Sequence, residues 1–231
     1  MCFIMSKVFQ LKFVVFVFML LIPFRISAQV NDAGLWASIN LEKKFNKKWS
    51  LHFTEELRMN ENITEAGVLF SEITGEYQYN KMFGFSAGYR FIQKRRVDDS
   101  YSIRHRYLFN LTVKNKWGSF STNFRLRYQS QYADVYSSSD GPVPANFLRP
   151  KLTVKYNTQK KYTPYISGEL FLHMNRADGI LMDTYRMAAG VEYEFSKQSS
   201  IDLGYLVNRE IQVKDPLTSY VISVGWNYTF K

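Results

Sequence analysis

The chain has 231 residues and a formal net charge of +10 at pH 7, because 30 lysines and arginines outnumber 20 aspartates and glutamates. Its single cysteine, Cys2, lies at the very start of the sequence, which excludes disulfides and clusters of thiolate metal ligands from the rest of the chain. Sixteen tyrosines and nineteen phenylalanines, with six prolines, favour strands that have one apolar and one polar face.

The N-terminal segment has the features of an export signal. An apolar run from Val8 to Phe24 follows Lys7, and Ala28 supplies the small residue expected before a cleavage site. A single membrane anchor is the alternative, but no charged stop-transfer run follows and no second stretch of roughly 18 apolar residues occurs. We therefore expect residues 1–28 to be a cleaved signal peptide and residues 29–231 to form one domain.

The basic charge persists beyond this segment. Residues 1–28 hold three of the cations and no acidic residue, so the remaining chain has a formal charge of +7. Export argues against nucleic acid as a partner. Anionic lipid head groups, lipopolysaccharide or a small anionic solute are the partners expected for such a surface.

Ten consecutive segments place apolar residues at every second position, which is the pattern of strands in a β-barrel. In the first of them, Trp49, Leu51 and Phe53 share one face, while His52 and Thr54 share the other. Each segment is about the 9–11 residues that cross a bilayer at a tilt. The segments lie at 49–59, 69–79, 83–91, 101–113, 120–129, 147–156, 162–173, 183–195, 200–211 and 218–230.

One more alternating segment precedes these ten, at Leu35, Ala37, Ile39 and Leu41. Eleven strands would break the even number expected of outer-membrane barrels. The segment is therefore either an extra element outside the barrel or the sign of a twelfth, unrecognised strand. The sequence predicts an all-β fold: an antiparallel transmembrane β-barrel of ten to twelve strands.

Short and long connections alternate between the segments, as they do in barrels with periplasmic turns and outer loops. The third long connection contains the loop-forming residues Ser137 to Pro144 and is the candidate ligand-facing loop. The short connections are 80–81, 115–118, 157–161 and 196–199, and the long ones are 61–67, 94–100, 132–146, 175–182 and 208–217.

If the aromatic face meets lipid, the opposite face lines the lumen and carries charges of both signs. A barrel of this size has a narrow interior, which long opposed charges fill by pairing. The alternative is an anion-attracting arginine stripe made by Arg104, Arg106, Arg125 and Arg127. The candidate lumen-lining residues are Arg58, Glu72, Glu76, Arg90, Arg104, Arg106, Arg125, Arg127, Glu169, Arg186 and Glu192.

Catalytic chemistry finds little support in the sequence. A barrel hydrolase needs a hydroxyl nucleophile beside a histidine, and the nearest approach is the face that His52 shares with Thr54 and Glu56, followed by His173 with Glu169. No two histidines have metal-ligand spacing, so we expect no catalytic residues, metal or cofactor. Calcium at the outer-loop carboxylates is a generic possibility, with Asp98, Asp99 and Asp178 as ligands.

Several motifs resemble domain-of-unknown-function family 2490, which consists of exported, predicted outer-membrane barrel proteins. The resemblance covers nearly all of the chain after the signal and implies no activity or catalytic residues. Its motifs are Asp32, Gly34 and Trp36; Leu41 to Phe45; Lys47 to Trp49; Glu55 to Arg58; Gly88 to Arg90; Arg104 to Tyr107; Pro164 to Ser167 with Glu169; and Val224 to Tyr228.

The sequence thus predicts an outer-membrane barrel of structural or narrow-channel type in a Gram-negative cell envelope, more plausibly not an enzyme, with its lumen largely filled by paired charges. Its expected partners are outer-membrane lipids, lipopolysaccharide and the barrel assembly machinery. Two other functions stay open: a lipid-modifying barrel enzyme, and an adhesion or binding barrel that displays residues 132–146. A soluble exported β-sandwich is the alternative architecture.

Overall fold

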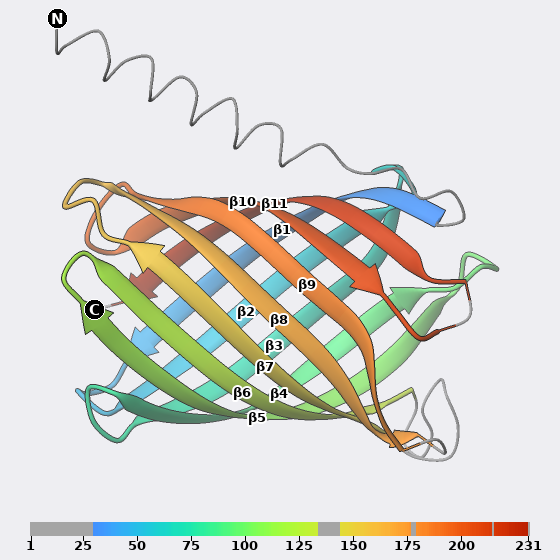
Figure 1. The fold of residues 1–231 in the computed structure, drawn as a ribbon, viewed down its shortest axis with the longest axis horizontal. Helices are drawn as coiled ribbons and strands as arrows, with labels where there is room; N and C mark the ends of the chain where they lie inside the picture. Colours follow the sequence, from blue (N-terminus) through green and yellow to red (C-terminus); the bar gives the residue numbers. More distant parts are fainter. Residues whose placement is uncertain (1–29, 134–143, 177–178, 214, 231) are drawn as a thin grey trace, which may run out of the picture.

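A computed structural model describes residues 30–133, 144–176, 179–213 and 215–230 (Figure 1). The expected signal peptide, residues 1–28, lies outside the described residues, as does most of the expected long loop 132–146. Within the described ranges no helix is long and apolar enough to cross a membrane.

Eleven strands close into one barrel across the described residues (Figure 1). Each strand pairs with its neighbour in the sequence, and the first strand pairs with the last. The strands are β1 (Val30–Lys44), β2 (Trp49–Asn60), β3 (Glu65–Gln78), β4 (Phe83–Arg95), β5 (Tyr101–Trp117), β6 (Phe120–Tyr132), β7 (Ala145–Tyr156), β8 (Tyr162–Arg176), β9 (Gly179–Glu194), β10 (Ser199–Glu210) and β11 (Leu217–Phe230).

The seam between β1 and β11 is parallel, whereas the other pairs are antiparallel. An odd number of strands that alternate in direction leaves the first and last running the same way, so they can close only as a parallel pair. The pairing extends from Val30 opposite Leu217 to Lys43 opposite Phe230. The side-chain amide of Asn40 also donates to the Asn227 side-chain oxygen across the seam, at 3.0 Å.

This closure corrects the parity argument. The segment at residues 35–41 is neither an element outside the barrel nor the sign of a twelfth strand among the described residues, because it forms β1 and completes the barrel. The other ten strands lie where alternation predicts them, and most extend further at the end that carries the longer connections.

The two ends of the barrel differ in their connections. We call the end with the β1–β2, β3–β4, β5–β6, β7–β8 and β9–β10 connections the turn end, and the opposite end the loop end. Two of the expected long loops are short, because β2 continues to Asn60 and β3 starts at Glu65, while β8 and β9 are separated by residues 177–178. The rest of each expected loop belongs to strands: residues 65–67 to β3, 175–176 to β8 and 179–182 to β9.

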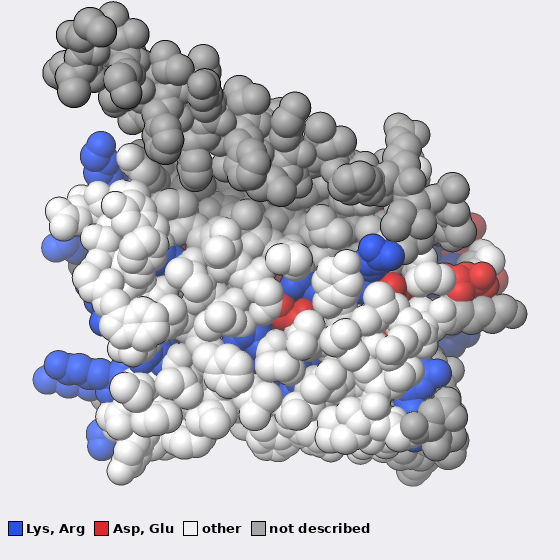
Figure 2. All heavy atoms as spheres, in the orientation of Figure 1, with Lys and Arg blue, Asp and Glu red and all other residues white. Residues whose placement is uncertain are grey.

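The outer face of the barrel is apolar. Large side chains point away from the interior on every side, among them Phe109 on β5, Ile166 on β8 and Met187 on β9, whose exposed fractions are 57%, 61% and 62%. In Figure 2 the visible wall is largely uncharged, and lysines and arginines gather at the left, which is the turn end. A continuous apolar surface of this size marks contact with another apolar phase or partner.

The inner face is polar, and its buried side chains include Arg127, Arg149, Gln129 and Glu169. Small residues make room where large side chains cross the interior. The Tyr165 hydroxyl donates to Asp202 at 2.8 Å and lies over two glycines, Gly190 and Gly204.

Gly190 is expected to be intolerant of a side chain. A Cβ at this position would lie 2.6 Å from the Leu203 carbonyl oxygen and 2.6 Å from the Tyr165 hydroxyl, whereas one at Gly168 would meet nothing within 4 Å. Gly190→Ala should lower the free energy of unfolding by about 1–3 kcal/mol through overpacking. Urea unfolding of the purified barrel measures this, with Gly168→Ala as the matched control. Equal midpoints for the two variants would contradict this packing.

Candidate functional site: the charged interior of the barrel

Two carboxylates, one buried and one largely buried, organise the middle of the interior. The first is Glu72 on β3, whose Oε2 lies 2.6 Å from the Nε of Arg90 on the neighbouring β4. Its other oxygen lies 3.9 Å from an Nη of Arg127, which comes from β6. Strands β3 and β6 are separated by two others, so this contact spans part of the lumen.

The second carboxylate is Glu169 on β8, which is 3% exposed and faces three arginines. Its Oε1 lies 2.6 Å from Arg125 and 2.9 Å from Arg149, and its Oε2 lies 3.6 Å from Arg186. These arginines come from β6, β7 and β9, so Glu169 ties four strands together. Charge-assisted hydrogen bonds of this kind are strong in a low-dielectric interior.

Aromatic rings separate the arginines that stand side by side. The guanidinium of Arg58 lies 3.8 Å from the ring centroid of Trp36, and that of Arg186 lies 4.7 Å from the same centroid. Phe70 stacks in the same way with Arg90 and Arg58, and Phe171 with Arg149 and Arg186. Guanidinium planes stack well on aromatic faces, which leaves their N–H edges free to donate.

These contacts form a continuous series around the interior, which we call the arginine–aromatic belt. It connects β7, β8, β9, β1, β2, β3 and β4 through side chains that touch in sequence. Its members are Arg149, Phe171, Arg186, Trp36, Arg58, Phe70 and Arg90.

A cavity of about 480 Å³ lies on the loop-end side of the belt, and its lining is strongly basic. Eight cationic side chains line it, against two acidic ones among the described residues, Asp183 and Glu210. The cations are Arg58, Arg90, Lys94, Arg104, Arg106, Arg149, Arg176 and Arg186.

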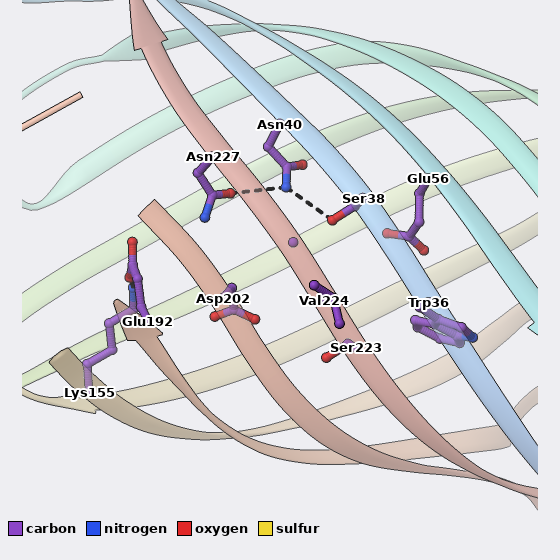
Figure 3. Close-up of a pocket in the computed structure, with 11 residues that line it drawn as sticks. Trp36, Ser38, Asn40, Glu56, Lys155, Glu192, Asp202, Ser223, Val224 and Asn227 are labelled. Atoms are coloured by element: carbon purple, nitrogen blue, oxygen red, sulfur yellow. Dashed lines mark hydrogen bonds and ion pairs between the residues drawn. The ribbon is translucent and has the colours of Figure 1, made fainter. Parts of the chain in front are cut away.

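A second cavity, of about 360 Å³, lies on the turn-end side and has the opposite charge balance. Glu56, Glu192 and Asp202 line it together with one described cation, Lys155 (Figure 3). Lys155 lies 2.8 Å from Glu192. These two cavities therefore differ in charge: the one toward the loops is basic and this one toward the turns is acidic.

The expected arginine stripe is divided between two roles. Arg125 and Arg127 contact the buried carboxylates, whereas Arg104 and Arg106 line the basic cavity. Arg106 donates to the side-chain oxygen of Gln131, including through its Nε at 3.1 Å.

The remaining candidates lie at the two ends. Glu76 contacts His52 and Lys114 near the turn end, and Glu192 contacts Lys155 there. Arg58 pairs with Glu56 at 2.6 Å at the level of the belt.

Sequence reasoning missed Arg149 and the three rings of the belt. Arg149 stands beside Pro150, in a segment whose alternation is less regular than in the others, and the register that sets it opposite Arg127 on β6 is visible only in the structure. Trp36, Phe70 and Phe171 lie on faces that otherwise carry polar residues, but the predicted lumen residues were all charged side chains.

The histidine sites do not have the geometry of a catalytic triad. Ser50 Oγ lies 3.0 Å from the Nε2 of His52, and Glu76 lies 3.4 Å from the same nitrogen. A triad requires the nucleophile and the acid on opposite ring nitrogens. Thr54 is bonded instead to Asn40. His173 stacks on Phe147, and its Nδ1 lies 3.9 Å from Asp183.

The carboxylates considered for calcium have local partners. Asp98 accepts hydrogen bonds from the hydroxyl and the backbone N–H of Ser100, which lower the pKa of its carboxyl group, and Asp99 pairs with Arg95 at 2.6 Å. Asp178 lies outside the described residues. Among the residues that the structure describes, no three His, Cys, Asp or Glu side chains gather as a metal site.

Comparisons with known proteins support the resemblance seen in the sequence. The model of a protein family described as "Protein of unknown function (DUF2490)" matches residues 33–216. No curated protein matches the chain. Among solved structures, a bacterial polysaccharide outer membrane secretin is similar with a TM-score of 0.53 and 10% sequence identity, over 81% of this chain and 67% of that one. At this identity the likeness concerns the fold.

Glu169 is expected to be a main determinant of stability. Glu169→Gln removes one negative charge from between three arginines and should lower the free energy of unfolding by about 3–5 kcal/mol, because it leaves buried cations uncompensated. Urea titration of the folded barrel measures the loss. Glu192→Gln is the control, since Glu192 is half-buried with one cationic partner, Lys155, and should change stability by less than about 1 kcal/mol. Similar losses in both variants would contradict a special role for Glu169.

Proposed function

Because the chain belongs to the DUF2490 family, whose description assigns no activity, we propose a function from the barrel itself: an outer-membrane β-barrel of structural or narrow-channel type. In this proposal residues 1–28 are an export signal and residues 29–231 form the membrane domain. The observation that carries it is the combination of an apolar outer face with a lumen crossed by ion pairs.

The outer face supports the membrane location. Exposed apolar side chains occur on all sides of a closed barrel whose strands have 12 to 17 residues, which exceeds the 9–11 needed to cross a bilayer at a tilt. Aromatic side chains, including Trp49, Trp117 and Trp226, are exposed near the turn end, where an interfacial girdle is expected. The outer membrane location of the structurally similar secretin agrees with this proposal.

The connections and the charges give the orientation. Turns of this length face the periplasm in bacterial barrels, so the acidic cavity would open to the periplasm and the basic cavity to the outside. The lysines at the turn end would then meet phosphates of the inner leaflet. Lipids, lipopolysaccharide and the barrel assembly machinery are the partners that such a location implies.

The interior supports a narrow or closed lumen. The Glu72–Arg127 contact reaches across from β3 to β6, and the Glu169–Arg125 contact crosses β7 from β6 to β8. The arginine–aromatic belt fills further space at the same level, between the two cavities. An eleven-stranded barrel is also well below the size at which wide aqueous channels occur, about 16 strands.

Fractionation and conductance test the proposal together. The protein expressed in a Gram-negative host should remain with the outer membrane after carbonate extraction, and a soluble periplasmic product would contradict the membrane location. In planar bilayers the inserted wild-type protein should give no steps of porin size. Wide, steady channels from the wild type would contradict the filled lumen.

Removing the Glu72–Arg90 ion pair from the lumen should widen it. Glu72→Ser combined with Arg90→Ser shortens two side chains. Arg127 loses its contact with Glu72 but keeps its hydrogen bond to Asn110, and we expect discrete conductance steps several times those of the wild type. The control is Arg95→Ser with Asp99→Ser, which removes an exposed ion pair at the loop end. A control that conducts as well as the lumen variant would show that the pair does not restrict the pore.

A further inference from the structure

The arginines in the middle of the barrel outnumber the carboxylates that compensate them. Six arginines contact acidic side chains at this level, and in the described part of the chain those acids are three: Glu56, Glu72 and Glu169. Internal salt bridges therefore account for about half of the positive charge. The six arginines are Arg58, Arg90, Arg125, Arg127, Arg149 and Arg186.

The surplus is directed toward one cavity. Four of the six arginines also line the basic cavity, as does Arg106, whose acceptor is the neutral amide oxygen of Gln131. The two acids in the lining have other contacts: Glu210 accepts from the backbone N–H of Leu217, and Asp183 lies beside His173. Uncompensated cations in a low-dielectric wall produce a positive potential that attracts anions.

The arginine–aromatic belt fixes the orientation of the guanidinium donors that could bind a ligand. Arg58, Arg90, Arg149 and Arg186 have their planar faces against rings, so their orientation is fixed before anything binds. Among the described residues two buried guanidinium N–H groups are without a partner, the Nε of Arg149 in the belt and the Nε of Arg125. Guanidinium edges fixed in this way suit the oxygens of phosphate groups, which they bind in bidentate pairs.

We propose that the basic cavity is a binding site for a solute with two or more phosphate groups, which enters from the loop end. A volume of about 480 Å³ is within the range of small-molecule sites and exceeds the need of a single inorganic ion. Because several separate arginines surround the cavity, a ligand with several anionic groups fits it better than a ligand with a single anionic group. This proposal adds a ligand to the proposed function, and its test does not require the barrel to conduct or to lie in a membrane.

Calorimetric titration of the purified full-length protein with pyrophosphate tests the site. We expect saturable binding with one ligand per barrel, and weaker binding of inorganic phosphate and of sulfate. Because the proposed contacts are charge-assisted, affinity should fall as the chloride concentration rises. A second titration uses a lipid with a pyrophosphate head group in detergent micelles. If the protein binds this lipid but not free pyrophosphate, the proposal of a soluble ligand is overturned.

Arg106→Gln should weaken pyrophosphate binding about tenfold or more, since it removes one cation that makes no salt bridge to a carboxylate among the described residues. Arg106→Lys keeps the charge but lacks the planar guanidinium group that can donate two parallel hydrogen bonds, so an intermediate affinity is expected. Lys155→Gln removes the same charge from the acidic cavity and should leave binding unchanged. Heat-modifiable migration on gels verifies that each variant is folded.

The outcomes separate the site from general attraction to a basic protein. No pyrophosphate binding by the folded wild-type protein would overturn the proposal. Equal loss in Arg106→Gln and Lys155→Gln would do so too, because it would show a response to net charge rather than to this cavity. If Arg106→Gln does not fold, Arg106→Lys alone decides, since unchanged affinity in that variant would exclude bidentate recognition by Arg106.

Discussion

Charge compensation at Glu72 and Glu169 is the interaction on which the centre of this barrel depends. Period-2 alternation in a closed sheet sends every second side chain inward, and here the inward residues are long and charged. A charge confined there is costly unless a partner reaches it. Glu169 meets arginines from three strands, and Glu72 meets one from its neighbour and one from β6. The two carboxylates thus connect most of the β3 to β9 half of the wall from inside.

The arginine–aromatic belt allows arginines to lie beside one another in spite of the repulsion between their like charges. Arg58 and Arg186 carry the same charge, and Trp36 lies between them with its ring against both guanidinium groups. The negative faces of the rings screen neighbouring cations and fill the volume between them, so the lumen is occupied without a carboxylate for every arginine. Removing the rings would therefore expose repulsion as well as empty space.

The sequence predicted the wall of the barrel better than its contents. Alternation located ten strands and also revealed residues 35–41, but an even-number rule led to the wrong interpretation of that segment, because pairing between the two ends of a chain is not visible in a local pattern. The inward-facing charged residues could be recognised from the same period-2 alternation that located the strands. Their partners could not, since Arg125 and Glu169 lie 44 residues apart and meet through the curvature of the sheet. Trp36 and Phe171 were not among the predicted lumen residues, because all of those were charged side chains.

Internal pairing and anion attraction are the two interpretations that the interior charges allow, and the geometry makes them compatible. On the turn-end side of the belt each acid of the cavity has a partner: Glu56 pairs with Arg58, Glu192 pairs with Lys155, and Asp202 accepts from the Tyr165 hydroxyl. On the loop-end side cations predominate. Arg106 makes no salt bridge among the described residues there, and a desolvated cation without one weakens the fold, so an arrangement that served packing alone would favour an uncharged residue at this position. A basic cavity at the loop end, next to a middle section that is filled by salt bridges, is instead the arrangement expected of a barrel that binds an anion and restricts its further passage.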